Sequence, residues 1–362
     1  MKKIYTAFLL LTIFIIPVGA QKSSILVLGD LHYDLLEDHD MDWLAKKPDD
    51  LRQVTEEYTI FTKNHWSDFM KILRNKISAT KPSVKGIIQL GDLSEGLAGS
   101  PAKAMQMARN TIEAIEEVRM PVPWILIKGN HDITGPGAAE AFNEFYIPEI
   151  RKQTKNPDIN SANYSYSFNN IQVTCVDPWD KTSNIVSFLE NELSRSNAAV
   201  KFVAVHEPVI PVTERCWHIF RDQPDKREKL LEVIARNKAI VLCAHLHRYS
   251  VVRRETPFGP VVQIMLVSVV RDSNYLVPQK VITKYGSSLA EAVPEWQLET
   301  MEQRKQMLAD ESKFITYYTQ TDLPGYAVIK INSRTSNVKL EYYAAFGKKP
   351  YDKISISEML RK

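Results

Sequence analysis

The chain has 362 residues, of which 44% are hydrophobic and 25% charged, values typical of a folded globular protein. Its formal net charge of +3 and the absence of long like-charged runs argue against a nucleic-acid or anionic-membrane surface. Three cysteines, Cys175, Cys216 and Cys243, can form at most one disulfide, which excludes a disulfide-rich scaffold and leaves stability to a hydrophobic core.

The first twenty residues have the pattern of a secretory signal peptide. Lys2 and Lys3 precede an apolar run at residues 7–17, and the small residues Val18-Gly19-Ala20 follow it. The run is shorter than the ~20 residues that a membrane-spanning helix needs. We therefore expect an exported mature chain, periplasmic or secreted, with an N-terminal anchor left in place as the alternative. Loss of two lysines would leave a net charge of +1, and no later stretch is predicted to span a membrane.

Short apolar runs then alternate with segments of helical periodicity. The apolar runs predict strands at residues 24–30, 85–92, 122–130, 171–177, 201–207 and 239–245. The periodic segments predict helices near residues 59–78, 103–118, 138–149, 183–195 and 225–237. Near-continuous Val, Ile and Leu is typical of strands buried on both faces, and the alternation indicates an α/β architecture.

The pattern changes after His247. Residues 249–270 predict strands around a Pro-Phe-Gly turn, residues 326–346 a closing hairpin, and residues 294–314 a helix between them. No repeat, low-complexity tract or linker divides the chain, so we expect a signal peptide at 1–20 and a single domain at 21–362.

Five predicted strands each end in residues that can bind a cation. The strand at 24–30 ends in Asp30, with His32 after it, and the strand at 85–92 ends in Asp92. The strand at 122–130 ends in Asn130, followed by His131 and Asp132. The strand at 201–207 contains His206 near its end, and the strand at 239–245 ends in His245, with His247 after it. Five of the eight histidines lie in these short motifs, and His39, His65 and His218 lie outside them. Ligands of open α/β sheets bind beyond the carboxyl ends of the strands, where parallel neighbours would bring these residues together.

The residue types indicate a class of metal. A Gly-Asp turn or a single histidine at a strand end is common in ordinary structure, so the interpretation depends on the ordered set. Asp, Asn and His without a thiolate favour Mn, Fe or Zn and argue against a soft-metal or iron–sulfur site. There are more ligands than one ion needs, which predicts two ions that share a carboxylate. Such pairs, ~3.5–4 Å apart, promote phosphoryl displacement and generate a hydroxide nucleophile.

The ordered motifs resemble those of the calcineurin-like metallophosphoesterase superfamily. They are GDLH (29–32), GD (91–92), GNHD (129–132), VHEP (205–208) and AHLH (244–247), in family order over residues 24–250. The resemblance implies a four-layer α/β/β/α sandwich, two mixed β-sheets packed face to face with flanking helices, in which the C-terminal strands and hairpin complete the second sheet. It also implies one metal on Asp30, His32 and His247, a second on Asn130, His206 and His245, and Asp92 bridging both.

The same resemblance implies the catalytic roles. Asn130 and His131 would contact the substrate phosphate, His131 would protonate the leaving oxygen, and Asp132 would orient the His131 imidazole. A neighbouring carboxylate favours the imidazolium, in agreement with an acid role. The final motif begins with Ala244 in place of the usual Gly, a strain only if φ there is positive. Glu95 stands where purple acid phosphatases have a Tyr, which argues against that branch.

The predicted activity is metal-dependent hydrolysis of a small phosphorylated substrate, a monoester or a diester. A non-catalytic metal-binding scaffold of the same fold is the alternative from another class, although no predicted ligand is missing. A nuclease is a third hypothesis, but no nucleic acid is expected as a partner because the net charge is near zero. The loop at 214–223, with Arg215, Trp217, His218 and Arg221, either lines a pocket or is a surface loop anchored by Trp217 and Phe220. The oligomeric state is not predicted.

Overall fold

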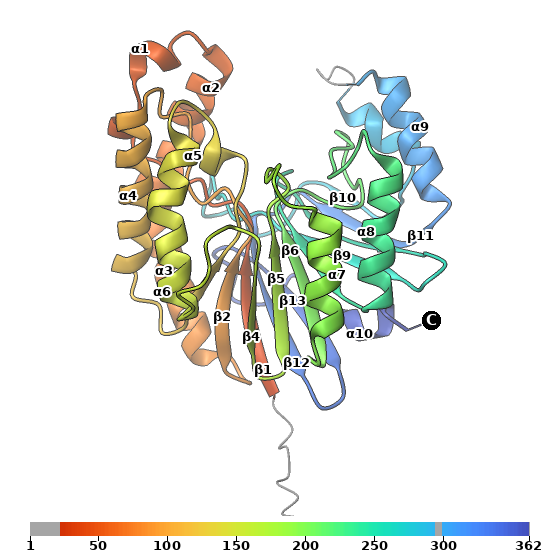
Figure 1. The fold of residues 1–362 in the computed structure, drawn as a ribbon. Helices are drawn as coiled ribbons and strands as arrows, with labels where there is room; N and C mark the ends of the chain where they lie inside the picture. Colours follow the sequence, from red (N-terminus) through yellow and green to blue (C-terminus); the bar gives the residue numbers. More distant parts are fainter. Residues whose placement is uncertain (1–21, 294–298, 362) are drawn as a thin grey trace, which may run out of the picture.

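The computed structural model describes residues 22–293 and 299–361, so the predicted signal peptide and residues 294–298 of the predicted C-terminal helix lie outside the described residues. Its strands form two mixed sheets that face each other, with helices on both outer sides (Figure 1). This is the α/β/β/α sandwich predicted from the motifs. Within the described residues, the helices are too short or too polar for any of them to span a bilayer.

The six-stranded sheet has the order β14-β13-β12-β1-β2-β3. Its parallel strands are β1 (Lys22–Leu28), β2 (Val84–Gln89) and β3 (Trp124–Leu126), and its antiparallel strands are β12 (Gly325–Asn332), β13 (Asn337–Ala344) and β14 (Asp352–Ser355). The predicted closing hairpin is β12–β13, but it does not complete the second sheet. That part of the prediction was wrong, because β12 pairs with the free edge of β1, with Leu28 opposite Tyr326.

The eight-stranded sheet has the order β10-β11-β8-β9-β7-β6-β5-β4. Its strands are β4 (Tyr164–Phe168), β5 (Ile171–Val176), β6 (Val200–Val205), β7 (Ile240–Cys243), β8 (Tyr249–Arg254), β9 (Val261–Met265), β10 (Val281–Ile282) and β11 (Ile315–Thr321). The strands that precede the predicted ligands are therefore divided: β1, β2 and β3 belong to one sheet, and β6 and β7 to the other. Their ends meet because the sheets face each other, and not because all five are parallel neighbours.

Helices cover the outer face of each sheet (Figure 1). On the six-stranded side lie α3 (Thr59–Ala79), α4 (Pro101–Glu117), α5 (Ala138–Ala141) and α6 (Ile147–Thr154); on the eight-stranded side lie α7 (Ile185–Arg195), α8 (Pro224–Arg236) and α9 (Met301–Ser312). The short helices α1 (Met41–Leu44) and α2 (Pro48–Gln53) precede α3, and α10 (Ile356–Met359) follows β14. A π-helical turn at Val54–Tyr58 joins α2 to α3, and another at Phe142–Tyr146 joins α5 to α6.

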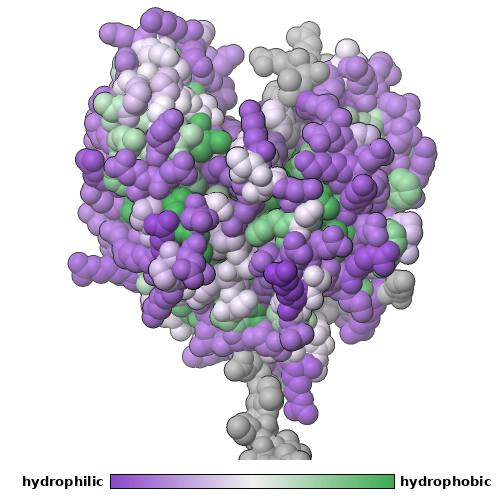
Figure 2. Space-filling view, viewed as in Figure 1, coloured by the Kyte–Doolittle hydropathy of each residue, from purple (hydrophilic) through white to green (hydrophobic). Residues whose placement is uncertain are grey.

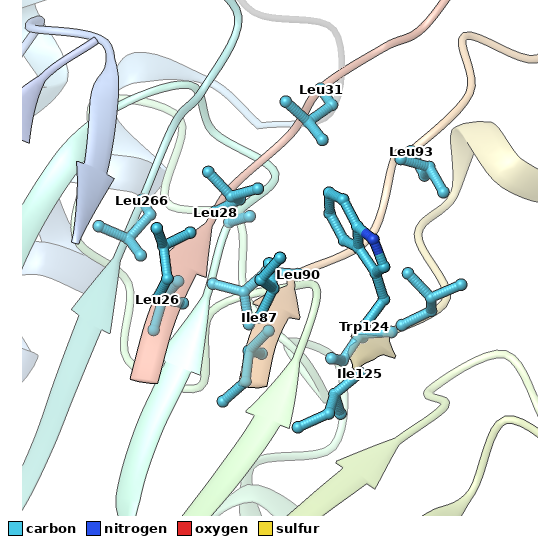
Figure 3. Packing of buried hydrophobic residues seen from close by; sticks show 14 of the residues in the cluster. Leu26, Leu28, Leu31, Ile87, Leu90, Leu93, Trp124, Ile125 and Leu266 are labelled. Atoms are coloured by element: carbon cyan, nitrogen blue, oxygen red, sulfur yellow. The ribbon is translucent and has the colours of Figure 1, made fainter. Parts of the chain in front are cut away.

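The main core lies around the six-stranded sheet and extends to its partner. Figure 3 shows Leu26 and Leu28 of β1, Ile87 of β2 and Leu266, which follows β9, in one cluster, and each of these side chains is fully buried. Full burial of one such side chain stabilises the fold by ~1.5–3 kcal/mol. Close to this core, the backbone N–H of Ser268 donates to the carbonyl of Asp30 at 3.1 Å. The end of β1 is thus tied directly to the eight-stranded sheet.

Candidate metal centre

Two glycines allow the ends of β2 and β3 to approach each other closely. Gly91 has a φ of +91°, and a Cβ there would lie 2.6 Å from Nδ1 of His206 and 2.8 Å from Cα of Gly129. A Cβ on Gly129 would lie 2.1 Å from the backbone nitrogen of Asp92. All three distances are too short for a Cβ atom, so these glycines set the separation between Asp92 and the residues that follow β3.

Four of the predicted ligands have left-handed backbone conformations. The φ angles are 44° at His32, 52° at Asp92, 74° at His245 and 49° at His247. Each such residue costs roughly 1–2 kcal/mol relative to an ordinary conformation, and strain of this kind concentrates at functional sites. Ala244 has no positive φ. The replacement of the usual Gly by Ala244 therefore introduces no strain.

Asp30, His32 and His247 converge as one cluster, with ligand atoms within 4.8 Å of one another. Nε2 of His32 lies 3.0 Å from Nε2 of His247. Nδ1 of His32 lies 2.6 Å from Oε2 of Glu95, so Nδ1 carries the proton and Nε2 presents a lone pair. Oδ2 of Asp30 is buried and has no hydrogen-bond partner among the described residues. These unmatched acceptors fit a cation.

Asp92, His206 and His245 form a second cluster, which Asn130 joins. Nε2 of His206 lies 3.0 Å from Oδ2 of Asp92, 3.1 Å from Oδ1 of Asn130 and 3.2 Å from Nδ1 of His245. Nδ1 of His206 donates to the carbonyl of Leu90 at 2.7 Å, which directs Nε2 into the cluster. Oδ2 of Asp92 also lies 3.8 Å from Nε2 of His32. Asp92 is therefore placed between the two clusters.

Charge states in this region suit metal binding. Burial lowers the pKa of His247 to about 3 and holds the pKa values of His32 and His245 well below their usual range, so these imidazoles are neutral, as ligands must be. Burial raises the pKa of Asp30 to about 7, an unfavourable state that a cation would relieve. Burial also opposes protonation of His206, but Asp92 outweighs it and raises that pKa to about 9. Binding of a cation at His206 would therefore be coupled to proton release.

The family follows from the comparison with known proteins. The model for calcineurin-like phosphoesterases matches residues 23–249, more than half of the chain and a range that contains all five motifs. The chain belongs to this family. Family membership and the two clusters together indicate a dinuclear metal centre.

Solved structures of this phosphoesterase fold agree with the architecture. A dimetal phosphatase from Danio rerio has a TM-score of 0.52 at 11% identity, covering 92% of this chain and 98% of that one. PhoD has a TM-score of 0.50 at 10% identity, covering 92% of this chain and 68% of that one. No curated protein sequence matches the chain. At these identities, the similarity shows the fold alone.

His131 lies beside both clusters of the phosphoesterase site but is held by Glu95. Its Nδ1 lies 2.6 Å from the carbonyl oxygen of Glu95 and 3.4 Å from Oε2 of the same residue. Because a carbonyl only accepts, Nδ1 carries a proton and Nε2 remains available. Burial opposes the charged imidazole, but the carboxylates of Glu95 and Asp92 outweigh it and hold the pKa of His131 well above its usual range.

Among the described residues, the carboxylate of Asp132 has no hydrogen bond to the imidazole of His131. Its carboxylate accepts hydrogen bonds of 2.8–3.1 Å from the backbone N–H groups of four residues: Asp92, Leu93, Ser94 and Gly129. The predicted orienting role of Asp132 was therefore wrong, because this side chain fastens the turn after β2 to the turn after β3. Glu95 holds His131 instead. The available sequence signal was its position three residues after Asp92, which we interpreted only as a departure from purple acid phosphatases.

A pocket of about 470 Å³ opens beside the two clusters. Its lining includes Asn130, His131, His245 and His247, and also Tyr58, Arg215 and Trp217. Figure 2 shows a hollow at the top of the molecule, between the lobe with α1 and α2 and the lobe with α9. The 214–223 loop thus lines the pocket through Glu214, Arg215 and Trp217, while His218 is buried outside the lining and Arg221 pairs with Glu299 at 2.8 Å.

Proposed function

We propose that this protein hydrolyses small phosphate esters at a dinuclear transition-metal centre, with Mn, Fe or Zn as the ions. The observation that carries the proposal is the pair of clusters with Asp92 between them, next to a pocket that His131 also lines. Asp30, His32 and His247 would hold one ion, Asn130, His206 and His245 the other, and Asp92 both. The bound ions would supply Lewis acidity and an activated water.

The protein residues would position the substrate and move the proton. Asn130 and His131 both line the pocket, where they can contact the phosphate. Nε2 of His131 would donate a proton to the leaving oxygen, since Nδ1 is committed to the Glu95 carbonyl. Glu95 would keep both His131 and His32 in place, through contacts at 3.4 and 2.6 Å. Asp132 would act on the turns that carry Asp92 and Asn130 and not on the proton transfer.

The direct test is an assay of the metal-free protein on p-nitrophenyl phosphate and bis-p-nitrophenyl phosphate, with Mn²⁺, Fe²⁺ or Zn²⁺ added back. We expect about two ions bound per chain, and we expect only the metal-loaded protein to hydrolyse these compounds. The ratio of the two rates assigns the enzyme to monoesters or diesters. A protein that binds two ions and hydrolyses neither compound would support the metal-binding scaffold instead, and one that binds no metal would remove the centre altogether.

We also infer that residues 1–20 direct export, from the basic start, the apolar run and the small residues before Gln21. Expression of the full chain in a bacterium, followed by fractionation and N-terminal sequencing, tests this. We expect a mature protein that begins at Gln21 outside the cytoplasm. An uncleaved chain in the membrane fraction would identify an anchor.

A further inference from the structure

Four arginines line the active-site pocket outside the metal-ligand clusters. They are Arg52, Arg215, Arg248 and Arg271. They come from four separate segments: α2, the loop after β6, the residue before β8 and the loop after β9. Only folding brings these guanidinium groups to one pocket, so no charged run in the sequence marks them.

Two carboxylates accompany these arginines, and both are less exposed than their partners. Glu57 pairs with Arg52 at 3.1 Å and with Arg271, and Glu214 pairs with Arg248 at 3.3 Å. The Glu57 and Glu214 side chains are each only 12% exposed, whereas those of Arg52, Arg248 and Arg271 are 49%, 35% and 65% exposed. The two carboxylates thus lie deeper than the guanidinium groups with which they pair. The surface that a ligand meets in this pocket therefore carries more positive than negative charge.

A second pocket adjoins this arginine cluster. It has a volume of about 460 Å³ and shares His247, Arg248 and Arg271 with the first pocket. Its lining also includes Val267, Val269, Tyr275 and Pro324. The hydroxyl of Tyr275 accepts a hydrogen bond of 2.9 Å from the backbone N–H of Gln279, which fixes the ring. A ligand anchored at the metal centre can pass the arginines and place an apolar or aromatic part here.

We propose that the preferred substrates carry a second phosphate, bound by Arg52, Arg215, Arg248 and Arg271 while the metal centre holds the scissile phosphate. The inference rests on the proposed function and names its substrate class. A single phosphate would be bound by the metal centre, Asn130 and His131. Each guanidinium group has five N–H donors, so the arginines can bind a second anion while Glu57 and Glu214 remain paired with Arg52, Arg271 and Arg248. Guanidinium groups bind phosphate through paired, charge-assisted hydrogen bonds, which is why arginine is suited to this task. The apolar part of such a substrate would lie against Tyr275.

Competitive inhibition by nucleotides that differ in one phosphate tests the second site. The metal-loaded protein is assayed on p-nitrophenyl phosphate with adenosine 5′-monophosphate, adenosine 5′-diphosphate or adenosine 3′,5′-bisphosphate as inhibitor. The two doubly phosphorylated compounds place the second phosphate at two different spacings. We expect at least one of them to bind about tenfold or more tightly than the monophosphate, at physiological ionic strength.

Variants of the arginine cluster then locate the effect. Arg271→Gln and Arg52→Gln should remove most of that tenfold difference, while lowering monophosphate affinity much less. Arg236→Gln is the matched control, because Arg236 is 57% exposed and paired with Glu232 at 2.7 Å on α8, outside either pocket lining.

Equal affinity of the wild-type protein for all three nucleotides would overturn the second-phosphate site, and so would an equal loss for all three in the variants. Either result would leave the proposed hydrolysis of p-nitrophenyl phosphate standing. If neither p-nitrophenyl phosphate nor bis-p-nitrophenyl phosphate is hydrolysed, the proposed function fails separately, and calorimetric titration of the same nucleotides still decides the inference.

Discussion

At the residue scale, Glu95 links the two halves of the proposed chemistry. Its Oε2 accepts from Nδ1 of His32, a predicted metal ligand, and its carbonyl accepts from Nδ1 of His131, the predicted acid. Sequence motifs identified both histidines because each follows an apolar strand. They did not identify Glu95 as their partner, since a carboxylate in a loop has no pattern that reveals where its side chain points.

Replacement of His131 by alanine should affect turnover according to the leaving group. With an alkyl phosphate, whose leaving oxygen needs a proton, we expect kcat to fall about 10²–10⁴-fold. With p-nitrophenyl phosphate the loss should be much smaller, because p-nitrophenolate leaves without protonation. Steady-state kinetics on both substrates, with metal content measured in parallel, check this. An equal loss on both compounds would contradict an acid role, and loss of bound metal would indicate a ligand.

Asp132→Asn should destabilise the fold. The carboxylate accepts from four backbone N–H groups, and an amide would turn its own donor toward some of them. Leaving a buried donor without an acceptor costs about 1–3 kcal/mol. We therefore expect the free energy of unfolding to fall by an amount near the upper end of this range. Urea unfolding at pH 8 measures it, with Asp158→Asn at an exposed position as control. A variant as stable as wild type would show that Asp132 does not hold the two turns.

At the element scale, strands and helices with a strong apolar pattern were easier to predict than short or exposed strands and irregular turns. The parallel strands and the long helices carry strong periodicity, and the structure has them near the predicted positions. The prediction missed β4, which is mostly half-exposed and reads Tyr-Ser-Tyr-Ser-Phe, and β10, which has two residues. It also missed β11, whose first residues are exposed. Such strands depend on their neighbours for hydrogen bonds and have little local signal.

The π-helical turn at Val54–Tyr58 was equally invisible in the sequence. It inserts an irregular turn before α3 and brings Tyr58 into the site, where the ring stacks on His32 with centroids 4.2 Å apart and planes 14° apart. Irregular turns of this type are frequent at functional sites. The sequence indicated a helix from residue 59 but gave no reason to place Tyr58 in the pocket.

The segment between β1 and α3 should respond to pH through His39. Nε2 of His39 lies 2.7 Å from Oδ1 of Asp34 and Nδ1 lies 3.1 Å from the carbonyl of Leu97, so both nitrogens face acceptors. Burial opposes the charged ring, but Asp34 outweighs it and raises the pKa of His39. Because the pKa of His39 is higher in the folded state, protonation of His39 stabilises the fold. This contribution to the free energy of unfolding is complete below the unfolded-state pKa of ~6.5 and is lost as the pH rises through the folded-state pKa.

We therefore expect the difference in unfolding free energy between wild type and His39→Gln to be largest below about pH 6 and to shrink toward pH 9. Urea unfolding across this range measures it. His65→Gln is the matched histidine control, because His65 lies on α3 and its ring contacts that of Phe346, with centroids 5.9 Å apart, instead of a carboxylate. A difference that stays constant with pH would contradict an imidazolium at His39.

At the scale of the whole molecule, the sequence predicted two sheets only through the family resemblance. The apolar runs before Asp30, Asp92, Asn130, His206 and His245 look alike, because strands buried on both faces have the same composition in either sheet. Nothing in their order tells which strands are neighbours. Pairing of β12 with β1 depends on contacts between residues about 300 positions apart, such as Leu28 and Tyr326, and local patterns do not encode these.

Removal of the metals should lower the thermal stability of the whole domain. Ligands that bind only the folded state stabilise it by about 2.7 kcal/mol at a concentration of 100 Kd. With an unfolding entropy of ~2.1 cal/mol/K per residue, this free energy corresponds to roughly 4 °C in the melting temperature of this domain for each bound ion. Scanning calorimetry of metal-loaded and chelator-treated protein checks the shift. An unchanged melting temperature on chelation, with metal content confirmed before and after, would contradict binding at this centre.

The division of the ligands between the two sheets has a mechanical consequence. Asp30, Asp92 and Asn130 extend from the six-stranded sheet, and His206, His245 and His247 from the eight-stranded one. All three cysteines are free, so no disulfide joins the two sheets. Bound ions would then act as inorganic cross-links at one end of the sandwich, the role that disulfides have in many exported proteins. A site with ligands from both sheets is complete only after the sheets have packed together. We therefore expect the ions to bind late in folding.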